Sequence, residues 1–451
     1  MKTTDAMYRL FSLIKKNSLL CTVVLTMTTV ALRAQNPISP AGVYIADPTA
    51  RVDSDGKMYI YGSLDESCER YCSPRYHVLS SSDLRHWQLH ENTFRSDDAG
   101  AAAAGHSLYA PDMIYRDSTY YLYYCLDNGG EGVAVSGSPA GVFRHGKTME
   151  GISGIDPTVF IDDDGQAYYY WGQFAAKGAR LHRDMTSIDR SSITGNLLTE
   201  QEHFFHEGGF MFKRHGIYYF VYAHIGRQDR PTCIGYATSR TPLGPFAYGG
   251  VIIDNAGADP AAWNNHGSVV EFRGQWYVLY HRPTHGCDKM RRACIEPITF
   301  RPDGSIAEAP MTSQGAGQPL SAFARIDAGR ACLLAGNVRI ATVDPPSGNE
   351  ALTAIRHGDR ATWKYIDYGN GAAQCRIRVR AQAGGRIDVA AGYPWSESLG
   401  GVDVPAHSDW TTYTFDIRPT EGVHPLLLRF YGGEGDLFDI DWAVFVETLK
   451  R

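Results

Sequence analysis

Residues 155–172 of this 451-residue chain read IDPTVFIDDDGQAYYYWG. A short apolar run ends at three aspartates and Gly165, and four consecutive aromatic residues follow. Two short β-prone runs separated by an Asp-Gly turn are the signature of a β-hairpin. The segment therefore predicts two antiparallel strands whose entry carries an acidic residue, Asp156.

The same pattern occurs five times in the first two thirds of the chain. The five copies occupy residues 46–62, 109–124, 155–172, 206–222 and 265–280. Between them lie further short strands, such as residues 76–80 and 232–237, so that each unit is expected to hold four strands. Hairpins that recur about every 45 to 65 residues match the blade spacing of a β-propeller. We expect an all-β fold with a five-bladed β-propeller over residues 38–312.

Composition agrees with a turn-rich β protein that has no nucleic-acid partner. Aromatic residues make up 12% of the chain, which includes 27 Tyr and 47 Gly. The net charge is −6 without basic runs, whereas binding to phosphates requires a positive surface. Flat aromatic rings also suit sugars, whose CH faces stack on them. An oligosaccharide or polysaccharide is therefore the expected partner, and nothing in the composition indicates the oligomeric state.

Three carboxylates stand at equivalent positions of the repeat. Asp47, Asp156 and Glu207 each precede the turn glycine of their copy by nine residues, and His266 precedes its glycine by eight. The first strand of each blade lines the channel of a propeller, so these side chains are expected to converge at one mouth. For any one of these acids taken alone, hydrogen bonding to amides at the start of a strand is the better interpretation. Three acids at the same position of the repeat instead favour a functional site.

Converging carboxylates suit the hydrolysis of glycosidic bonds. Mutual repulsion in a partly dry cavity raises at least one pKa, so that one group can act as an acid while another acts as a base. Glycoside hydrolysis needs this pair, and inverting enzymes hold the two carboxyl groups roughly 6.5–9.5 Å apart with a water between them. Asp112, in the second copy, does not share the register of the other three.

Five motifs resemble glycoside hydrolase family 43, a family of five-bladed propellers that act mostly on arabinofuranosides and β-xylosides. They are Ala46-Asp47-Pro48, Ala110-Pro111-Asp112, Ile155-Asp156-Pro157, His206-Glu207-Gly208 and Asn265-His266-Gly267-Ser268. The resemblance implies that Asp47 is the general base and Glu207 the general acid. It further implies that Asp156 orients Glu207 and tunes its pKa.

The resemblance also implies residues that contact the substrate. His266 would stand at the channel centre near a water or a calcium ion, with no cofactor required. An arginine of the last blade, either Arg291 or Arg292, would enter the pocket. Tyr109 replaces a tryptophan that many family members carry in the sugar subsite, and Asp112 is a further candidate for substrate binding.

The repeat stops after Pro310, and a second domain is expected from residue 322 to 449. Short strands that alternate with Gly-rich turns predict a β-sandwich, or jelly roll. Several segments, among them residues 361–365 and 438–442, resemble carbohydrate-binding module family 6. Trp363 or Tyr365, together with Trp410, are the candidate residues for stacking on sugar, although core packing explains each equally well.

Residues 1–34 have the pattern of a secretory signal peptide. Basic residues precede an apolar run at 18–32, and Ala34 offers a small-residue cleavage site. We expect a secreted or periplasmic protein that is not membrane-bound after cleavage; an uncleaved anchor is the alternative. Eight cysteines remain, with Cys68 near Cys72 and Cys287 near Cys294. Disulfides and buried thiols are both open for them.

The sequence therefore predicts an exported, inverting glycoside hydrolase that removes arabinofuranosyl or xylosyl residues from plant polysaccharides or oligosaccharides. Within the same fold, the alternatives are an endo-arabinanase and an enzyme that trims galactan or galactofuranosides. In other classes, the alternatives are a non-catalytic sugar-binding propeller and a scaffold for protein contacts.

Overall fold

The computed structural model describes residues 35–100 and 103–447 of the chain. The predicted signal peptide at 1–34 and the last two residues of the predicted sandwich lie outside the described residues. The described part is almost entirely β-structure, with only short helical turns. None of its helices is long and apolar enough to cross a membrane.

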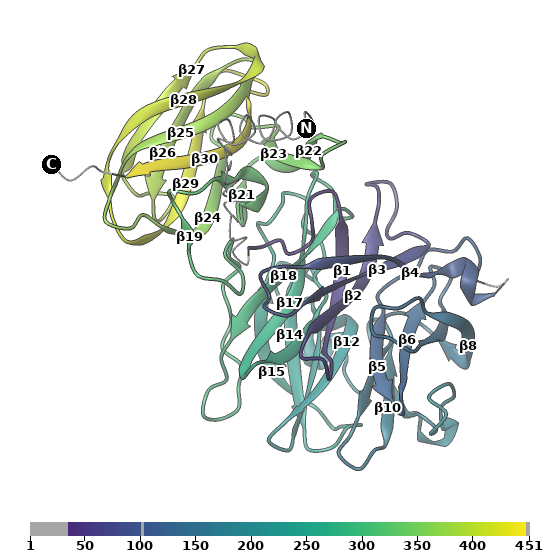
Figure 1. Cartoon of the computed structure of the whole chain (residues 1–451). Coiled ribbons are helices and arrows are strands. Elements are labelled where there is room, and N and C mark those ends of the chain that lie inside the picture. Colours follow the sequence, from purple (N-terminus) through teal and green to yellow (C-terminus); the bar gives the residue numbers. More distant parts are fainter. Residues whose placement is uncertain (1–34, 101–102, 448–451) are drawn as a thin grey trace, which may run out of the picture. The chain divides into compact units, whose positions relative to one another are not determined.

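Five antiparallel sheets follow one another from Tyr44 to Ile298, in the purple to green part of Figure 1. Blade 1 holds β1 (Tyr44–Val52), β2 (Met58–Asp65), β3 (Arg75–Ser81) and β4 (Gln88–Arg95). Blade 2 holds β5 (Asp112–Arg116), β6 (Thr119–Cys125), β7 (Gly130–Ser136) and β8 (Arg144–Ser153). Blade 3 holds β9 (Thr158–Ile161), β10 (Ala167–Trp171) and β11 (Lys177–Arg180). Blade 4 holds β12 (Phe205–Arg214), β13 (Ile217–His224), β14 (Cys233–Ser239) and β15 (Ala247–Asp254). Blade 5 holds β16 (Ser268–Phe272), β17 (Gln275–Pro283) and β18 (Arg291–Ile298).

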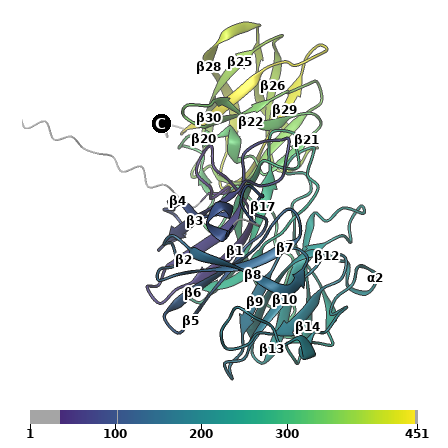
Figure 2. The ribbon, with the colours of Figure 1, turned by 90° about the vertical axis from the view of Figure 1, so that its right-hand side faces the viewer.

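The first strands of the five blades form a closed ring. β1 contacts β5, β5 contacts β9, β9 contacts β12, β12 contacts β16, and β16 contacts β1. Figure 2 shows β9 and β10 beside β13 and β14 of the next blade. The ring places the start of each first strand near the others, as the sequence repeat predicts for a five-bladed propeller.

The prediction of four strands in every blade was wrong for blades 3 and 5, which have three each. In blade 3, isolated bridges such as Gly178 with Thr194 stand where a fourth strand would pair. In blade 5, the segment that precedes β1 runs alongside β18. The amide of Ile38 donates to the carbonyl of Ala293 at 2.8 Å, and the amide of Ile295 donates to Oδ1 of Asn36 at 2.9 Å.

Two sheets make up the β-sandwich in the green to yellow part of Figure 1. One has the order β19 (Leu320–Ser321), β24 (Arg360–Asp367), β29 (Val423–Tyr431), β26 (Gly385–Ala391), β27 (Ser398–Val404), with β21 (Leu333–Ala335) on β24. The other has the order β22 (Arg339–Asp344), β23 (Asn349–Thr353), β30 (Asp439–Glu447), β25 (Ala372–Ala381), β28 (His407–Thr420), with β20 (Ile326–Asp327) on β30. Alternate apolar residues of both sheets fill one core between them.

Short helical turns complete the described structure. They are η1 (Ser96–Ala99), η2 (Arg190–Ser192), α2 (Glu200–His203) and η3 (Ala328–Arg330). In α2, the side chain of Thr199 accepts from the amide of Glu202 and caps the first turn. This turn directly precedes β12, the strand that carries Glu207.

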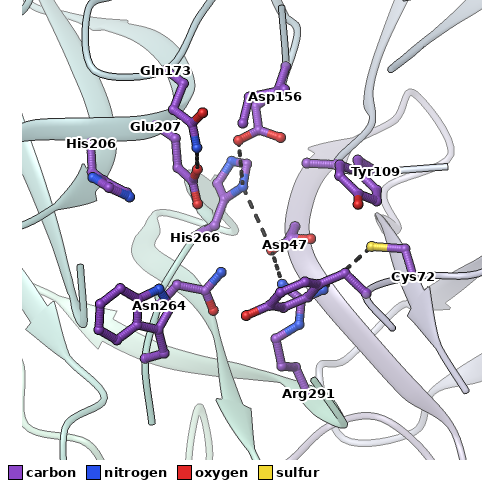
Figure 3. A pocket seen from close by; sticks show the side chains of 14 residues that line it. Asp47, Cys72, Tyr109, Asp156, Gln173, His206, Glu207, Asn264, His266 and Arg291 are labelled. Carbon is purple, nitrogen blue, oxygen red and sulfur yellow. Dashed lines mark hydrogen bonds and ion pairs between the residues drawn. The ribbon is translucent and has the colours of Figure 1, made fainter. Parts of the chain in front are cut away.

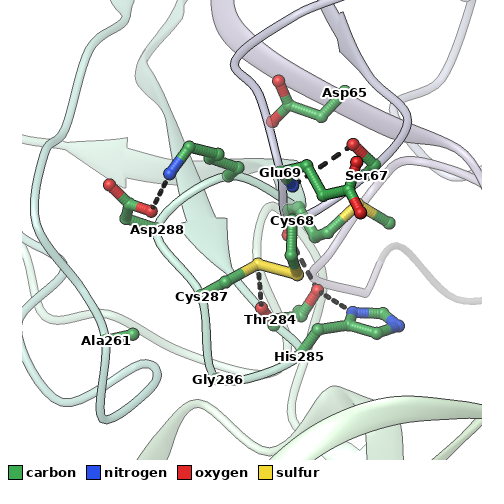
Figure 4. Close-up of a disulfide and its surroundings, with 12 residues drawn as sticks. Asp65, Ser67, Cys68, Glu69, Ala261, Thr284, His285, Gly286, Cys287 and Asp288 are labelled. Carbon is green, nitrogen blue, oxygen red and sulfur yellow. Dashed lines mark hydrogen bonds and ion pairs between the residues drawn. A yellow bond between two sulfur atoms is a disulfide. The ribbon is translucent and has the colours of Figure 1, made fainter.

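A disulfide joins the first blade to the last (Figure 4). Cys68, between β2 and β3, bonds to Cys287, between β17 and β18, across 219 residues of sequence. Neither of the pairs that are close in sequence forms. The other six cysteines among the described residues are free and buried. The described cysteines therefore comprise one disulfide and six buried thiols.

Candidate active site

The acidic residues at the strand entries meet at one cavity of about 230 Å³. Asp47 comes from blade 1, Asp156 from blade 3, and Glu207 from blade 4, and His266 precedes blade 5. Figure 3 shows His266 between Asp156 and Asp47, with Glu207 on the same side as Asp156. The structure thus brings together the three carboxylates that share the repeat register and His266, which lies one position away from that register.

An irregular backbone aims the three carboxylates into the cavity. Asp47 and Asp156 adopt positive φ angles of 52° and 58°, and the pairing of β1 with β2 shifts register between Ala46 and Thr49. β12 shifts register on both sides of Glu207, and the next residue, Gly208, has φ 65°. Bulges re-aim side chains at functional sites, and strained non-glycine residues concentrate there.

Asp47 is held as a carboxylate by a dense set of donors. Nη1 of Arg291 donates to its Oδ1 at 3.0 Å, and Oγ of Ser63 donates to its Oδ2 at 2.7 Å. His281 lies 3.3 Å from the same Oδ1. Burial opposes the charge of Asp47, but Arg291 and the histidines outweigh it and hold the pKa of Asp47 well below its usual range. Asp47 is therefore ionised throughout the neutral range.

Asp156 stands in the opposite electrostatic environment. Burial and the charges of Glu207 and Asp47 raise the pKa of Asp156 well above its usual range. Between the two aspartates, Nδ1 of His266 lies 3.8 Å from Oδ1 of Asp47 and 3.9 Å from Oδ2 of Asp156. Burial lowers the pKa of His266 to about 4, so the ring is neutral near pH 7. Asp156 therefore keeps its proton near neutral pH, where Asp47 does not.

Glu207 is the most open of the three carboxylates, since it is half-buried while both aspartates are buried. Its Oε2 accepts a hydrogen bond from Nε2 of Gln173 at 2.7 Å. Gln173 follows β10 in an exposed loop. Neighbouring His206 pairs with Glu200 of α2 at 2.8 Å, which ties the start of β12 to the helical turn before it.

The structure shows which of the two arginines of β18 lines the cavity. Arg291 lines the cavity and holds both Asp47 and Asp65, and its Nε and Nη2 donate to Asp65 at 2.8 and 2.9 Å. The candidate Arg292 was wrong. It points to the other face of the strand, where it pairs with Glu350 of the sandwich, because successive strand residues alternate in direction.

Asp112 was wrong as a candidate for substrate binding. It is 1% exposed and does not line the cavity. Arg51 donates to both of its oxygens, at 2.8 and 2.6 Å, and Thr158 and the amide of Val159 donate to Oδ2. Asp112 therefore links blades 1, 2 and 3. Tyr109, by contrast, does line the cavity, and burial raises its pKa to about 12.

Several cavity residues escaped the sequence analysis. Tyr71, Gln173 and Trp263 line the cavity from connections outside the repeated motif. Tyr71 donates to Asp288 and lies with its ring 5.0 Å from the guanidinium carbon of Arg291. Asp65 supports Arg291 from the end of β2. Only Asn264 had a signal in the sequence, because it directly precedes the Asn265-His266-Gly267 motif.

The residues near His266 do not fit a calcium ion. Calcium takes six to eight oxygen ligands, whereas Arg291 already occupies Asp47, and no group of three or more His, Cys, Asp or Glu among the described residues is arranged to hold a metal. A cation would also face the guanidinium of Arg291.

The aromatic candidates of the sandwich do not form one site. Trp363 is 2% exposed and donates from Nε1 to the carbonyl of Asp327 at 3.1 Å, so it packs in the core. Tyr365 is half-buried on the same strand, β24. Trp410 lies in the other sheet, with the guanidinium groups of Arg378 and Arg380 at 5.6 and 5.0 Å from its ring.

Comparisons with known proteins agree with this geometry. Residues 34–306 match the model of Glycosyl hydrolases family 43, and residues 334–447 match that of Carbohydrate binding module (family 6). A xylosidase/arabinosidase of Thermoclostridium stercorarium is 29% identical, over 88% of this chain and 96% of that protein. An arabinoxylan arabinofuranohydrolase of Bacillus subtilis (strain 168) is 30% identical, over 89% and 90%.

A solved structure gives the same result. The crystal structure of a family 43 arabinoxylan arabinofuranohydrolase from Bacillus subtilis, in complex with cellotetraose, superimposes with a TM-score of 0.53. It is 27% identical, covering 93% of this chain and 99% of that one. The family match spans the whole propeller with its acidic cavity, and the chain is a glycoside hydrolase that belongs to glycosyl hydrolases family 43.

Proposed function

We propose that the protein is an exo-acting, inverting hydrolase that removes single arabinofuranosyl or xylosyl residues from arabinoxylan or its oligosaccharides. The observation that carries the proposal is the small cavity of about 230 Å³ with three carboxylates in its wall. Pockets for drug-sized ligands start at about 300 Å³, so this cavity suits one sugar unit. The names of the two relatives support arabinose and xylose as the sugars.

In this proposal, Asp47 is the general base. Its charge is fixed by Arg291 and Ser63, and it takes a proton from a water as the water oxygen bonds to the anomeric carbon. The bond from that carbon to the leaving oxygen breaks in the same step. Because the water enters opposite the leaving group, the configuration at the anomeric carbon inverts.

Glu207 is proposed as the general acid, which gives its proton to the leaving oxygen. It is the more accessible of the two acids at this side of the cavity, since Glu207 is half-buried and Asp156 is buried. Asp156 is a positioning residue in this proposal: it is buried, and burial together with the charge of Glu207 raises its own pKa, so that it stays protonated beside the general acid.

Hydrolysis of nitrophenyl α-L-arabinofuranoside and β-D-xyloside tests this proposal. We expect Glu207→Gln and Asp47→Asn each to lower kcat by about 10²–10⁴, because positioned acid–base groups contribute that much. Unchanged melting temperatures would show that the fold is intact. Proton NMR of the first product formed should show inverted configuration, and near-full activity in either variant would refute the assignment.

The products from arabinoxylan and from debranched arabinan distinguish exo from endo action. The proposal predicts free monosaccharide from the first minutes of reaction. Release of mixed oligosaccharides from debranched arabinan would instead indicate the endo-arabinanase alternative.

We also propose export of the protein, from the basic and apolar pattern of residues 1–34. Expression of the full chain in a bacterial host with N-terminal sequencing of the periplasmic fraction tests this. A mature protein that begins at Gln35 would support cleavage, whereas recovery of residues 1–34 on a membrane-bound chain would contradict it.

A further inference from the structure

The connection between β17 and β18, residues 284–290, is bonded to two other segments of the cavity wall. Asp288 accepts a hydrogen bond from the hydroxyl of Tyr71, which lines the cavity. The amide of Gly286 donates to Oδ2 of Asp259 at 3.1 Å. The chain after Asp259 reaches two further lining residues, Trp263 and Asn264. The position of residues 284–290 therefore affects several parts of the wall.

The sandwich contacts this connection through the edge strand β22. β22 is the outermost strand of its sheet, so its outer backbone groups can pair with another part of the chain. The amide of His285 donates to the carbonyl of Ile340 at 2.6 Å, and the amide of Thr342 donates to Nε2 of His285 at 3.1 Å. Ile340 and Thr342 are two residues apart on the same edge, so both bind the propeller at one residue.

The side chain of His285 extends this contact to the residue before Arg291. An amide can only donate, so Nε2 of His285 accepts from Thr342 and the proton of the neutral ring is on Nδ1. Burial lowers the pKa of His285, which keeps the ring neutral near pH 7. Nδ1 donates to Oγ1 of Thr284 at 2.8 Å, and Oγ1 donates to the carbonyl of Met290 at 2.7 Å. The hydrogen bonds thus run in one direction from the sandwich to the start of β18.

The surroundings of His285 fix its orientation. Its φ of 66° lies in a region that non-glycine residues adopt where neighbouring structure holds them. Its ring meets the ring of Tyr44, in β1, edge to face with centroids 5.3 Å apart. A Cβ at Gly286 would lie 2.7 Å from Cδ of Arg339, in β22, so this arginine packs directly on the backbone of the connection. Blade 1, the connection into blade 5 and the sandwich therefore meet at His285.

We propose that the β-sandwich is a structural part of the catalytic site, and that His285 is the positioning residue through which the sandwich fixes the cavity wall. The contact at His285 keeps Tyr71 and the segment that begins at Asp259 in place. Arg291 retains its own ion pairs with Asp47, so loss of the contact falls on substrate binding. The inference rests on the proposed function where hydrolysis is the measurement.

Kinetics of the full chain on the nitrophenyl substrates test this role. His285→Ala and Thr284→Val each interrupt the chain of hydrogen bonds, and we expect each to raise KM about threefold to tenfold, as loss of one hydrogen bond does. kcat should change by less than about twofold, because the loss concerns the wall and not the acid or base. The double variant should raise KM no further than the single variants, because both break the same chain. Thr284→Ser keeps the hydroxyl and should have the KM of the parent protein.

Asp388→Asn is the matched control. Asp388 is buried and pairs with Arg429 at 2.6 Å inside the sandwich, between β26 and β29. This variant should lower the unfolding free energy of the protein and leave KM unchanged. A rise in KM equal to that of His285→Ala would overturn the inference, because general loosening of the sandwich would then explain both. A KM like that of the parent protein in Thr284→Val would overturn it as well.

Hydrogen exchange measured by mass spectrometry separates this inference from the proposed function, because it requires no activity. In His285→Ala and in Thr284→Val, the amides of residues 68–73 and 259–266 should exchange faster than in the parent protein and in Asp388→Asn. Faster exchange there, in a protein that hydrolyses neither nitrophenyl substrate, would support the inference and contradict the proposed function. Hydrolysis by the parent protein, with unchanged exchange in both variants, would do the reverse.

Discussion

The charge of Arg291 is the main reason that Asp47 stays ionised. Arg291 is buried between Asp47 and Asp65, so its removal leaves two buried carboxylates without their partner. We expect Arg291→Gln to raise the pKa of Asp47, because burial alone favours the protonated acid. A base is active above its pKa, so the acidic limb of the pH profile of kcat/KM should move to higher pH.

Arg292→Gln is the matched control for that change. Arg292 is equally buried and pairs with Glu350 instead of with the cavity carboxylates. Both variants should lose about 3–5 kcal/mol of unfolding free energy, the cost of breaking a buried ion pair. Only Arg291→Gln should move the acidic limb. An equal shift in both profiles would show that general destabilisation, and not the charge on Asp47, sets the limb.

Glu131 is a second buried acid near the site that gives a pH-dependent prediction. Burial raises its pKa to about 8, and it accepts from Tyr169. Between about pH 4.5 and 8 the folded state therefore holds a proton that the unfolded state has lost. Stability falls as pH rises through this range.

We expect Glu131→Gln to remove that fall. Relative to the parent protein, its unfolding free energy should increase with pH by up to about 1.4 kcal/mol per unit, measured in urea at pH 5, 6 and 7. A constant difference between the two proteins across these pH values would show that Glu131 is ionised in the fold. The amide keeps the shape of the side chain, so the packing against Tyr169 is the same in both.

At the level of the element, the hairpin of β12 and β13 holds two glycines with positive φ for different reasons. A Cβ at Gly208 would lie 2.7 Å from the ring of His266, whereas a Cβ at Gly216 would meet nothing within 4 Å. Their φ angles are 65° and 72°. A side chain would be strained at either position, but only a side chain at Gly208 would also collide with a residue of the site.

Gly208→Ala should therefore displace His266 or Glu207 and abolish most of the activity on nitrophenyl substrates. Gly216→Ala should cost about 1 kcal/mol of unfolding free energy, the usual penalty of a left-handed residue, with full activity. Comparable losses of activity in both variants would mean that strain of the hairpin, and not the clash with His266, is responsible.

The sequence repeat predicted the hairpin that begins each blade and carries the site residues better than it predicted the complete blade. Paired strands and their turns are local, so the five hairpins and the register of Asp47, Asp156 and Glu207 are readable from the chain. The missing fourth strands of blades 3 and 5 are not, because outer strands depend on what covers the edge. For blade 5 the cover is a segment far away in sequence, which includes Asn36 and Ile38.

The sequence alone also does not show which of two adjacent strand residues faces the site. Arg291 and Arg292 are neighbours with the same chemistry, and only the orientation of β18 decides which of them meets Asp47. The same alternation places Trp363 of β24 in the core. Asp112 was misassigned because an acid near a strand entry can satisfy amides and an arginine as well as a substrate.

At the scale of the molecule, the Cys68–Cys287 disulfide links the two blades that meet where the ring closes. It joins the connection that carries Tyr71 to the one that leads into Arg291, and both residues line the cavity. A cross-link over 219 residues restricts the unfolded chain strongly, which in the chain-entropy description contributes about 5.4 kcal/mol.

The double variant Cys68→Ser/Cys287→Ser should therefore lose about 2–5 kcal/mol of unfolding free energy in urea. Its KM for nitrophenyl substrates should rise more than its kcat falls, because the loosened connections hold Tyr71 in the wall of the cavity but leave Glu207 in blade 4. Dithiothreitol should lower the stability of the parent protein to that of the variant and leave the variant itself unchanged, since the remaining described cysteines are free. A parent protein that keeps its stability in reductant while its thiols titrate as fully reduced would show that the closed ring of first strands holds blades 1 and 5 together without the cross-link.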